Sequence, residues 1–457
     1  MLDLLISGGL LVDPETKTSF YGDLGVLDGK IVQVGGEMPQ AARTLDASGL
    51  VVCPGLIDVH AHVDGISAYK DVEGCARLSL LQGVTTLVSG NCGASVQDVG
   101  AFFRRMDQGF PVHQAELMGH SALRKAVGLQ DIFQPATPEQ IQRMDALLKA
   151  ALDKGAAGVS FGLGYVPGTS MEEVLSAARL VAQYGRVVSV DTQMEDNYDL
   201  HSLQDAIDVG RSTGARMLIS HFVYQYGQGV IEEALEMVQR ARAEGVDIWA
   251  DSGMYVDWAT TIGSECFRES FVFSHCCQLP MLLVATGKYA GRSLDIDLYR
   301  EMRTLYPKET VICRTGWDES IYPPFDCGFV MPSSDTAPYD KGEGHPQIAG
   351  SFAGFFRMAR ETGRLSLEEA VYRATLLPAK TFGFGQKGRL SVGADADICA
   401  FDFERIQDRA SYVDKGRPDA PPEGVEHVLL DGQVALAYGK LENQRLGHAL
   451  RCLEEEA

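Results

Sequence analysis

Residues 55–64 read Gly-Leu-Ile-Asp-Val-His-Ala-His-Val-Asp, an apolar run that ends in two histidines two positions apart. Side chains alternate between the two faces of a β-strand, so this spacing places the imidazoles of His60 and His62 on one face. Two neutral imidazoles at the end of a strand are a good start for a transition-metal site. The alternative is an ordinary strand end that carries two structural histidines, and the rest of the chain decides between the two.

The middle of the chain, residues 54–383, alternates short apolar stretches with amphipathic, helix-like ones. The stretches typical of strands are 55–62, 83–90, 113–119, 155–162, 186–193, 215–221, 245–251 and 327–333. Eight alternations of strand and helix predict a (β/α)8 barrel. An insertion at about 252–326 separates the last two strands and is expected to form a packed excursion near the barrel mouth. Its large aromatic side chains include Trp258, Phe267, Phe271 and Tyr289.

Both ends of the chain have the short strands and tight turns of a small β-domain. The pairs Asp28-Gly29 and Asp431-Gly432 each lie between two short apolar runs, which is a hairpin signal. We expect residues 1–53 and 384–457 to form one composite β-sandwich domain beside the barrel.

The composition narrows the partners and the compartment of the protein. The 457-residue chain is 45% hydrophobic and carries a formal net charge of −22, with a sequence pI of about 4.8. This acidity argues against nucleic acid or an anionic membrane as a partner. The ten cysteines follow no disulfide spacing, no apolar run reaches roughly 18 residues, and the first residues show no signal-peptide pattern. These observations predict a cytoplasmic protein and leave a homo-oligomer open.

Further metal-binding side chains follow other predicted strands of the barrel. Cys92 follows the second strand, His221 the sixth and Asp335 the eighth. Active sites of such barrels are assembled at the C-terminal ends of the strands, so these residues should meet His60 and His62. Three imidazoles, a thiolate and a carboxylate form a ligand set for Zn²⁺, and the metal would hold the thiolate deprotonated.

Each of these residues also has an ordinary structural explanation when it is taken alone. Cys92 is then a small buried hydrophobe, His221 a core histidine and Asp335 an N-cap. Five such residues at the ends of four separate strands rarely coincide by chance, which favours the metal site.

Several motifs resemble the amidohydrolase superfamily and, within it, the N-acyl-D-amino-acid deacylase (D-aminoacylase) branch. The run 54–62 is similar to the superfamily's metal signature, and Gly-Asn-Cys-Gly at 90–93 is similar to the branch, in which the Cys is a metal ligand. Further stretches with this resemblance are 119–124, 162–168, 219–221, 345–346 and 388–397. The resemblance covers nearly the whole chain.

Three positions depart from the pattern of the branch. Gln193 stands where the branch carries a metal-binding His, and Val223 stands where it carries a Lys. Gln347 stands where the relatives carry the Arg that holds the substrate α-carboxylate, and Glu195 adds a negative charge. An amide does not replace the paired, charge-assisted hydrogen bonds of an Arg. The sequence therefore implies a substrate without that carboxylate, and one strongly bound Zn²⁺ with a second ion weak or absent.

The resemblance implies hydrolysis of a C–N amide bond of a small molecule by metal-activated water. Zn²⁺ would be held by His60, His62 and Cys92. His221 would complete the shell or face the substrate carbonyl, and Asp335 would be a ligand as well as the general base and acid. The side chains expected to contact the substrate are Tyr165, Gln193, Tyr255, His345 and Gln347.

Two other functions stay open at this point. A cyclic amide hydrolase of hydantoinase or dihydroorotase type commonly uses a carboxylated Lys on the fourth strand, and residues 156–162 contain no Lys. A degenerate member that binds a ligand without turnover is motivated by Gln193 and opposed by the intact His60, His62, Cys92 and Asp335.

Two smaller features have less specific signals. His120 and Arg124 follow the third strand and either line the site or brace a loop. His275, beside Cys276-Cys277 in the insertion, is interpreted as packing rather than as a second metal site.

Overall fold

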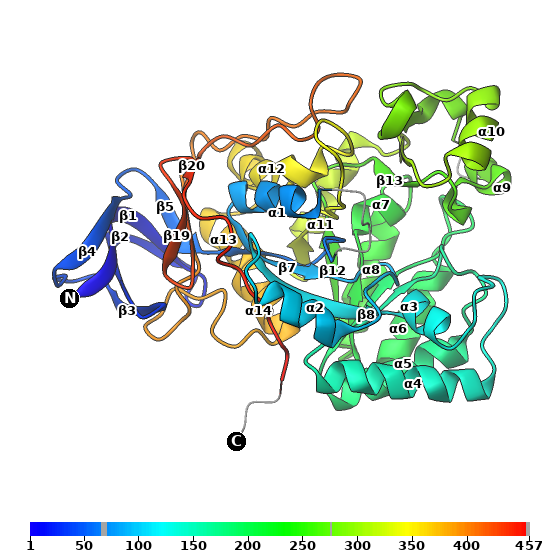
Figure 1. The fold of residues 1–457 in the computed structure, drawn as a ribbon, viewed down its shortest axis with the longest axis horizontal. Helices are drawn as coiled ribbons and strands as arrows, with labels where there is room; N and C mark the ends of the chain where they lie inside the picture. Colours follow the sequence, from blue (N-terminus) through cyan, green and yellow to red (C-terminus); the bar gives the residue numbers. More distant parts are fainter. Residues whose placement is uncertain (65–70, 275–276, 454–457) are drawn as a thin grey trace.

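The computed structural model describes residues 1–64, 71–274 and 277–453, and its central feature is a barrel of eight parallel strands (Figure 1). In order around the barrel the strands are β6 (Leu56–Asp58), β7 (Val84–Ser89), β8 (His113–Gly119), β9 (Gly158–Gly162), β10 (Val187–Asp191), β11 (Arg216–Ile219), β12 (Ile248–Ser252) and β16 (Val330–Pro332). Every neighbouring pair along this order is parallel. Each of the eight stretches predicted as strands overlaps one of them, and the predicted barrel is confirmed.

The barrel closes between its first and last strands, just beyond their C-terminal ends. Ala61 and Thr336 form a parallel bridge, and the His62 N–H donates to the Thr336 carbonyl at 2.7 Å. The buried carboxylate of Asp58 accepts the Ser334 N–H at 3.1 Å and also the Ser334 hydroxyl. This closure brings the two histidines that follow β6 next to the segment that carries Asp335.

Helices cover the outside of the barrel and connect its strands. They are α1 (Val72–Leu81), α2 (Val99–Met106), α3 (His120–Ala126), α4 (Pro138–Asp153), α5 (Met171–Gln183), α6 (His201–Thr213), α7 (Phe222–Tyr226), α8 (Ile231–Ala243), α11 (Pro323–Asp326), α12 (Gln347–Thr362), α13 (Leu367–Ala374) and α14 (Leu376–Phe382). Capping boxes at Thr137 and Ser170 fix the first turns of α4 and α5, because each side chain accepts a main-chain N–H that the helix leaves unpaired. Among the residues described, no helix is both long enough and apolar enough to cross a membrane.

Both ends of the chain contribute strands to one nine-stranded sheet, which lies to the left of the barrel in Figure 1. The N-terminal strands are β1 (Leu2–Asp13), β2 (Thr18–Leu27), β3 (Lys30–Val34), β4 (Ala41–Asp46) and β5 (Val51–Pro54). The C-terminal strands are β17 (Ile398–Phe401), β18 (Val425–Leu430), β19 (Gln433–Ala437) and β20 (Lys440–Leu441). The two ends meet where β5 pairs with β17, which confirms a β-domain built from both termini.

The long strand β1 changes its partner along its length, which lets the sheet fold around its own core. Residues 2–7 pair with β4 and residues 10–11 pair with β5, and the pairing of β1 with β2 shifts its register between Ile6 and Gly9. Gly8 has φ +76°, a conformation that a residue without Cβ adopts without strain. Both predicted hairpin turns, at Asp28-Gly29 and Asp431-Gly432, are present with positive φ at both residues.

The domain limits 1–53, 54–383 and 384–457 stay a prediction. The end of the described chain leaves the sheet and lies along the barrel, where Gly447 pairs with Phe110 and Ala449 pairs with Gln114.

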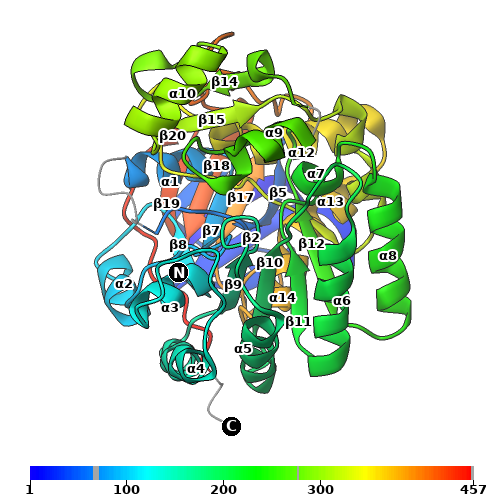
Figure 2. The ribbon, with the colours of Figure 1, turned by 90° about the vertical axis from the view of Figure 1, so that its right-hand side faces the viewer.

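The insertion between β12 and β16 forms a small unit with its own core (top of Figure 2). Its strands β13 (Trp258–Thr261), β14 (Leu282–Val284) and β15 (Thr310–Cys313) form an antiparallel sheet, accompanied by α9 (Glu269–Ser274) and α10 (Ile296–Leu305). Trp258 stacks on Phe267 with ring centroids 5.1 Å apart, which agrees with the prediction that the aromatic side chains of the insertion pack together. The side chain of Phe271 and residues His275 and Cys276 lie outside the described part, so the interpretation of His275 stays a prediction.

Candidate metal centre

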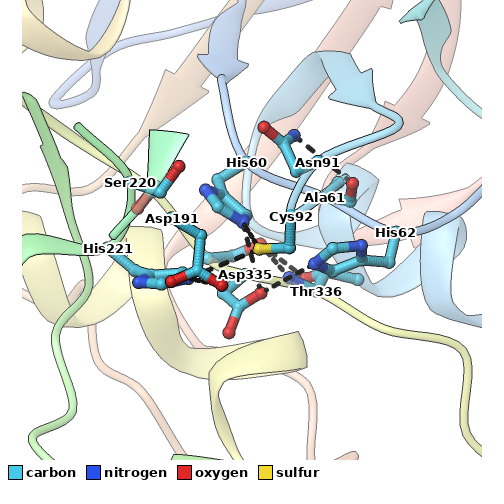
Figure 3. A network of polar contacts seen from close by, with 12 residues as sticks. His60, Ala61, His62, Asn91, Cys92, Asp191, Ser220, His221, Asp335 and Thr336 are labelled. Carbon is cyan, nitrogen blue, oxygen red and sulfur yellow. Dashed lines mark hydrogen bonds and ion pairs between the residues drawn. The ribbon is translucent and has the colours of Figure 1, made fainter. Parts of the chain in front are cut away.

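The five side chains expected to bind metal converge at the C-terminal end of the barrel (Figure 3). The Sγ atom of Cys92 lies 3.3 Å from His60 Nε2 and 3.4 Å from His221 Nε2. Oδ1 of Asp335 lies 3.2 Å from His62 Nε2 and 3.6 Å from His60 Nε2. His60 is fully buried, Cys92 and His221 are buried, and His62 and Asp335 are partly open to the cavity. The structure thus brings together every residue of the ligand set predicted from the strand ends.

Three of these residues have a strained main chain. Cys92, His221 and Asp335 have φ values of +50°, +32° and +49°, in the left-handed region that residues with a Cβ rarely adopt. Such conformations cost roughly 1 to 3 kcal/mol each and persist where the surrounding structure enforces them. All three lie two or three residues beyond the end of a strand, where the chain turns and directs the side chain into the centre.

A layer of buried carboxylates orients the histidines. Oδ2 of Asp251, at the end of β12, lies 3.4 Å from His60 Nδ1, which leaves His60 Nε2 directed at the centre. Oδ1 of Asp251 accepts the His221 N–H at 2.9 Å and the Ser333 hydroxyl at 2.6 Å. A carboxylate behind a ligand histidine is the usual device that fixes its tautomer and ring orientation.

The protonation properties of the centre suit a divalent cation. Burial, together with the carboxylates of Asp191, Asp335 and Asp251, raises the pKa of the Cys92 thiol well above its usual value. For Asp335, burial opposes ionisation, but the His62 contact and the charges of His60, His62 and His221 outweigh it and lower the pKa to about 2. A buried thiol among carboxylates becomes a thiolate only when a cation offsets the negative charge. Imidazole, thiolate and carboxylate are also the donors that Zn²⁺ prefers, so the residues fit a metal centre.

Asp191 is a member of the centre that the sequence analysis missed. It is the last residue of β10, and its Oδ2 atom lies 3.8 Å from His221 Nε2. Cys92, Asp191 and His221 offer ligand atoms within 4.8 Å of one another, as do His60, His62 and Cys92. Asp251 is the last residue of the predicted strand 245–251, and Asp191 lies two residues before the end of the predicted strand 186–193, so neither belongs to a motif that marks it as a ligand.

Gln193, expected to contact the substrate, lies outside this centre. β10 ends at Asp191, and the main chain then turns so that the Gln193 N–H donates to the Ser202 hydroxyl at 3.1 Å. The Gln193 side chain donates to Glu195 and borders a second cavity beside α6. Because β10 ends two residues before Gln193, the side chain that β10 directs into the centre is the carboxylate of Asp191 and not the amide of Gln193.

A cavity of about 470 Å³ opens above the centre and extends to the insertion. Its walls include the polar side chains of Tyr165, Tyr224 and Gln347 beside His62, Cys92, Asp191, His221 and Asp335. Much of the remaining wall is apolar and comes from Ile132, Val166, Met194, Trp258, Ala259 and Ala337. Among the described residues that line it, Lys125 is the one Lys or Arg.

The other residues expected to bind substrate divide between the cavity and the layer behind it. Tyr165 lines the cavity and donates to the Thr260 hydroxyl at 3.1 Å. Gln347 also lines it, but its amide accepts from the Tyr224 hydroxyl at 2.5 Å and donates to the Asp335 carbonyl at 2.6 Å. The lining that the structure describes does not include Tyr255 or His345. Their rings contact each other edge to face, and His345 Nδ1 accepts the Gln347 N–H at 3.1 Å, so both support the start of α12.

His120 and Arg124 brace a loop. Arg124 is buried and donates to Glu173 at 2.6 Å, to the Asp131 carbonyl at 3.0 Å and to the Gln134 carbonyl at 2.5 Å. His120 Nε2 lies 3.1 Å from the same Glu173 carboxylate.

Comparison with known proteins gives a consistent set of relatives. A model of the amidohydrolase family matches residues 51–435. The chain is 31% identical to N-acyl-D-glutamate deacylase of Alcaligenes xylosoxydans xylosoxydans, over 94% of this chain and 93% of the relative. It is 29% identical to D-aminoacylase of the same organism, over 98% and 97% of the two chains.

A solved structure with the same architecture contains a metal and an inhibitor. The N-acyl-D-glutamate deacylase from Bordetella bronchiseptica, complexed with zinc and a phosphonate inhibitor, superposes with a TM-score of 0.88 at 29% identity. The match covers 98% of this chain and 99% of that structure. The zinc in this relative agrees with the donor set at the centre described above.

Proposed function

The chain belongs to the amidohydrolase family, and from that premise we propose that it is a hydrolase of a linear amide with one strongly bound Zn²⁺. The residues proposed to hold the ion are His60, His62, Cys92, His221 and Asp335. The observation that carries the proposal is their convergence at the floor of a 470 Å³ cavity. The N-acyl-D-amino-acid deacylases among the relatives support an amide C–N bond as the target.

Asp335 is the proposed proton carrier. A bound Zn²⁺ lowers the pKa of water and polarises a carbonyl. The Asp335 carboxylate is ionised at neutral pH and partly open to the cavity, so it is able to accept the proton of an attacking water. It then returns that proton to the leaving nitrogen. Gln347, through its bond to the Asp335 carbonyl, holds this segment in place.

The walls of the cavity favour a substrate without a free carboxylate beside the amide. Gln347 occupies the position where the resemblance implies an Arg, and its amide group is already engaged by Tyr224 and Asp335. Lys125, the one Lys or Arg that the described lining contains, is exposed and belongs to the last turn of α3. Neutral N-acyl amides therefore suit the cavity better than N-acyl amino acids, because a carboxylate would lose its water without gaining a partner.

Matched substrate pairs test this proposal. For each of several N-acyl-D-amino acids, kcat/KM is measured for the free acid and for its α-carboxamide with zinc-loaded enzyme. We expect the carboxamides to be hydrolysed at least about tenfold more efficiently, which corresponds to ~1.4 kcal/mol. A preference for the free acids would overturn the substrate assignment.

Two alternatives are tested when hydantoins and dihydroorotate are added to the substrates of this assay. Hydrolysis of hydantoins or dihydroorotate in place of linear amides would identify a cyclic amide hydrolase. The solved hydantoinases superpose less well, for example with a TM-score of 0.66 at 18% identity. Inertness towards every substrate with metal bound would identify a protein that binds its ligand without turnover.

A further inference from the structure

We infer that Asp191 is a further ligand of the metal centre, on the side formed by Cys92 and His221. This rests on the proposed metal centre and deepens it. The sequence suggests a lost ligand, because Gln193 replaces a His. The structure instead supplies a carboxylate two residues earlier.

The distances fit coordination by three protein ligands. Two ligands bonded to one tetrahedral Zn²⁺ at about 2.0 to 2.3 Å stand roughly 3.3 to 3.6 Å apart. Cys92 Sγ and His221 Nε2 are 3.4 Å apart, and Asp191 Oδ2 is 3.8 Å from the same nitrogen. Figure 3 shows the Asp191 carboxylate beside the His221 ring and directed towards Cys92. A carboxylate oxygen beside a thiolate and an imidazole is a donor combination that Zn²⁺ accepts.

The surroundings of Asp191 orient one of its oxygens towards the ion. Gln225 Nε2 donates to Oδ1, which leaves Oδ2 as the atom that faces His221. The side chain is buried, with a relative exposure of 4%, so it is not a surface acid held in solvent. A ligand carboxylate whose second oxygen is held by an outer hydrogen bond is a common arrangement in metal sites.

The main chain excludes Gln193 from the same role. Its N–H is held by the Ser202 hydroxyl, and its side chain donates to Glu195 on the outer side of the barrel. A substitution at this position therefore changes no donor of the centre, which makes Gln193 the matched control for Asp191.

The test measures zinc affinity by competition with a chelator of known affinity, on the full chain, for the wild type, Asp191→Asn and Gln193→Ala. The isosteric Asp191→Asn replaces a charged ligand by a weak neutral one. We expect its zinc affinity to fall more than about 100-fold, beyond the roughly 10- to 100-fold cost of losing an outer partner. Gln193→Ala should retain the affinity of the wild type, and Gln193→His should gain none. Wild-type affinity in a folded Asp191→Asn variant would overturn the inference.

Two further measurements separate this inference from the proposed function. Co²⁺-substituted wild type should show the visible absorption of four-coordinate Co²⁺ with a thiolate ligand, and Asp191→Asn should alter its intensity. If Asp191→Asn does not fold, Gln225→Leu carries the test, and its zinc affinity should fall about tenfold because Oδ1 of Asp191 is released. Unchanged affinity in Gln225→Leu would then refute the role of Asp191. A wild type that binds no zinc would instead refute the metal centre as a whole.

Discussion

Asp251→Asn is the substitution that most directly tests how the centre holds its histidines. Three donors point at the Asp251 carboxylate: the His221 N–H and the Ser333 hydroxyl at Oδ1, and the ring of His60 at Oδ2. An amide has one oxygen only. The fixed main-chain N–H of His221 keeps that oxygen at the Oδ1 position, so the new NH2 group faces His60 Nδ1.

The consequence is a change of tautomer at His60. Nδ1 has to accept from the NH2 group, so the ring proton moves to Nε2, the nitrogen that faces Cys92 and the centre. A protonated nitrogen does not bind a metal. Loss of the hydrogen-bond partner behind a metal ligand typically lowers metal affinity 10- to 100-fold, which is about 1.4 to 2.7 kcal/mol of binding free energy.

The assay is chelator competition for zinc at neutral pH, with Ser333→Ala as the control. Ser333→Ala removes one donor to the same carboxylate and leaves the His60 tautomer unchanged, so its zinc affinity should stay within about threefold of the wild type. Its free energy of unfolding should fall by about 1 kcal/mol for the lost hydrogen bond. The reasoning is refuted if folded Asp251→Asn binds zinc as tightly as Ser333→Ala.

Four other outcomes follow from the structure. Asp335→Asn should lower kcat by about 10²- to 10⁴-fold, because it removes the proton carrier. Its zinc content should stay that of the wild type, because Asp335 is one metal ligand among several. Cys92→Ala, measured in the same way, should lose the zinc. Chelation of zinc should lower the melting temperature, because an ion present at 100 times its Kd stabilises the folded state by about 2.7 kcal/mol. Glu173→Gln should lower the free energy of unfolding at pH 7 by about 2 to 3 kcal/mol. Burial opposes ionisation of Glu173, but His120 and the Ala136 and Ser170 N–H groups lower its pKa from 4.5 to about 2. In denaturant titrations the difference between Glu173→Gln and wild type should therefore narrow as the pH falls from about 4.5 to 2.

The barrel and most of the centre could be predicted because their signals are local. A buried parallel strand is a short apolar run, and a ligand within a few residues of its C-terminal end lies at the same end of the barrel as every other such ligand. His60, His62, Cys92, His221 and Asp335 all obey this rule. The turn pairs at Asp28 and Asp431 were equally readable, because two residues with positive φ favour Asp-Gly.

The parts that could not be predicted depend on the last one or two residues of a strand. The sequence predicts one strand over residues 186–193, with Gln193 at its C-terminal end, next to the centre. β10 ends at Asp191 instead, because the chain after it is held by the bond of the Gln193 N–H to Ser202. A lone Asp at a strand end has no motif of its own, so Asp191 and Asp251 carried no distinctive signal. Nor does a sequence show that the amide of Gln347 is already engaged by its neighbours.

The pairing of β5 with β17 has a consequence for how the protein is made. Cys53 and Cys399 are partners in this pairing, so roughly 350 residues separate the two strands in the order of synthesis. At the 5 to 20 residues per second of translation, β5 waits roughly 20 to 70 s for its partner. During that time the edge of Val51, Val52 and Cys53, all buried in the finished sheet, is open to other chains. The N-terminal strands therefore need protection from pairing with other chains during translation. The sheet is completed only when the last fifth of the chain has left the ribosome.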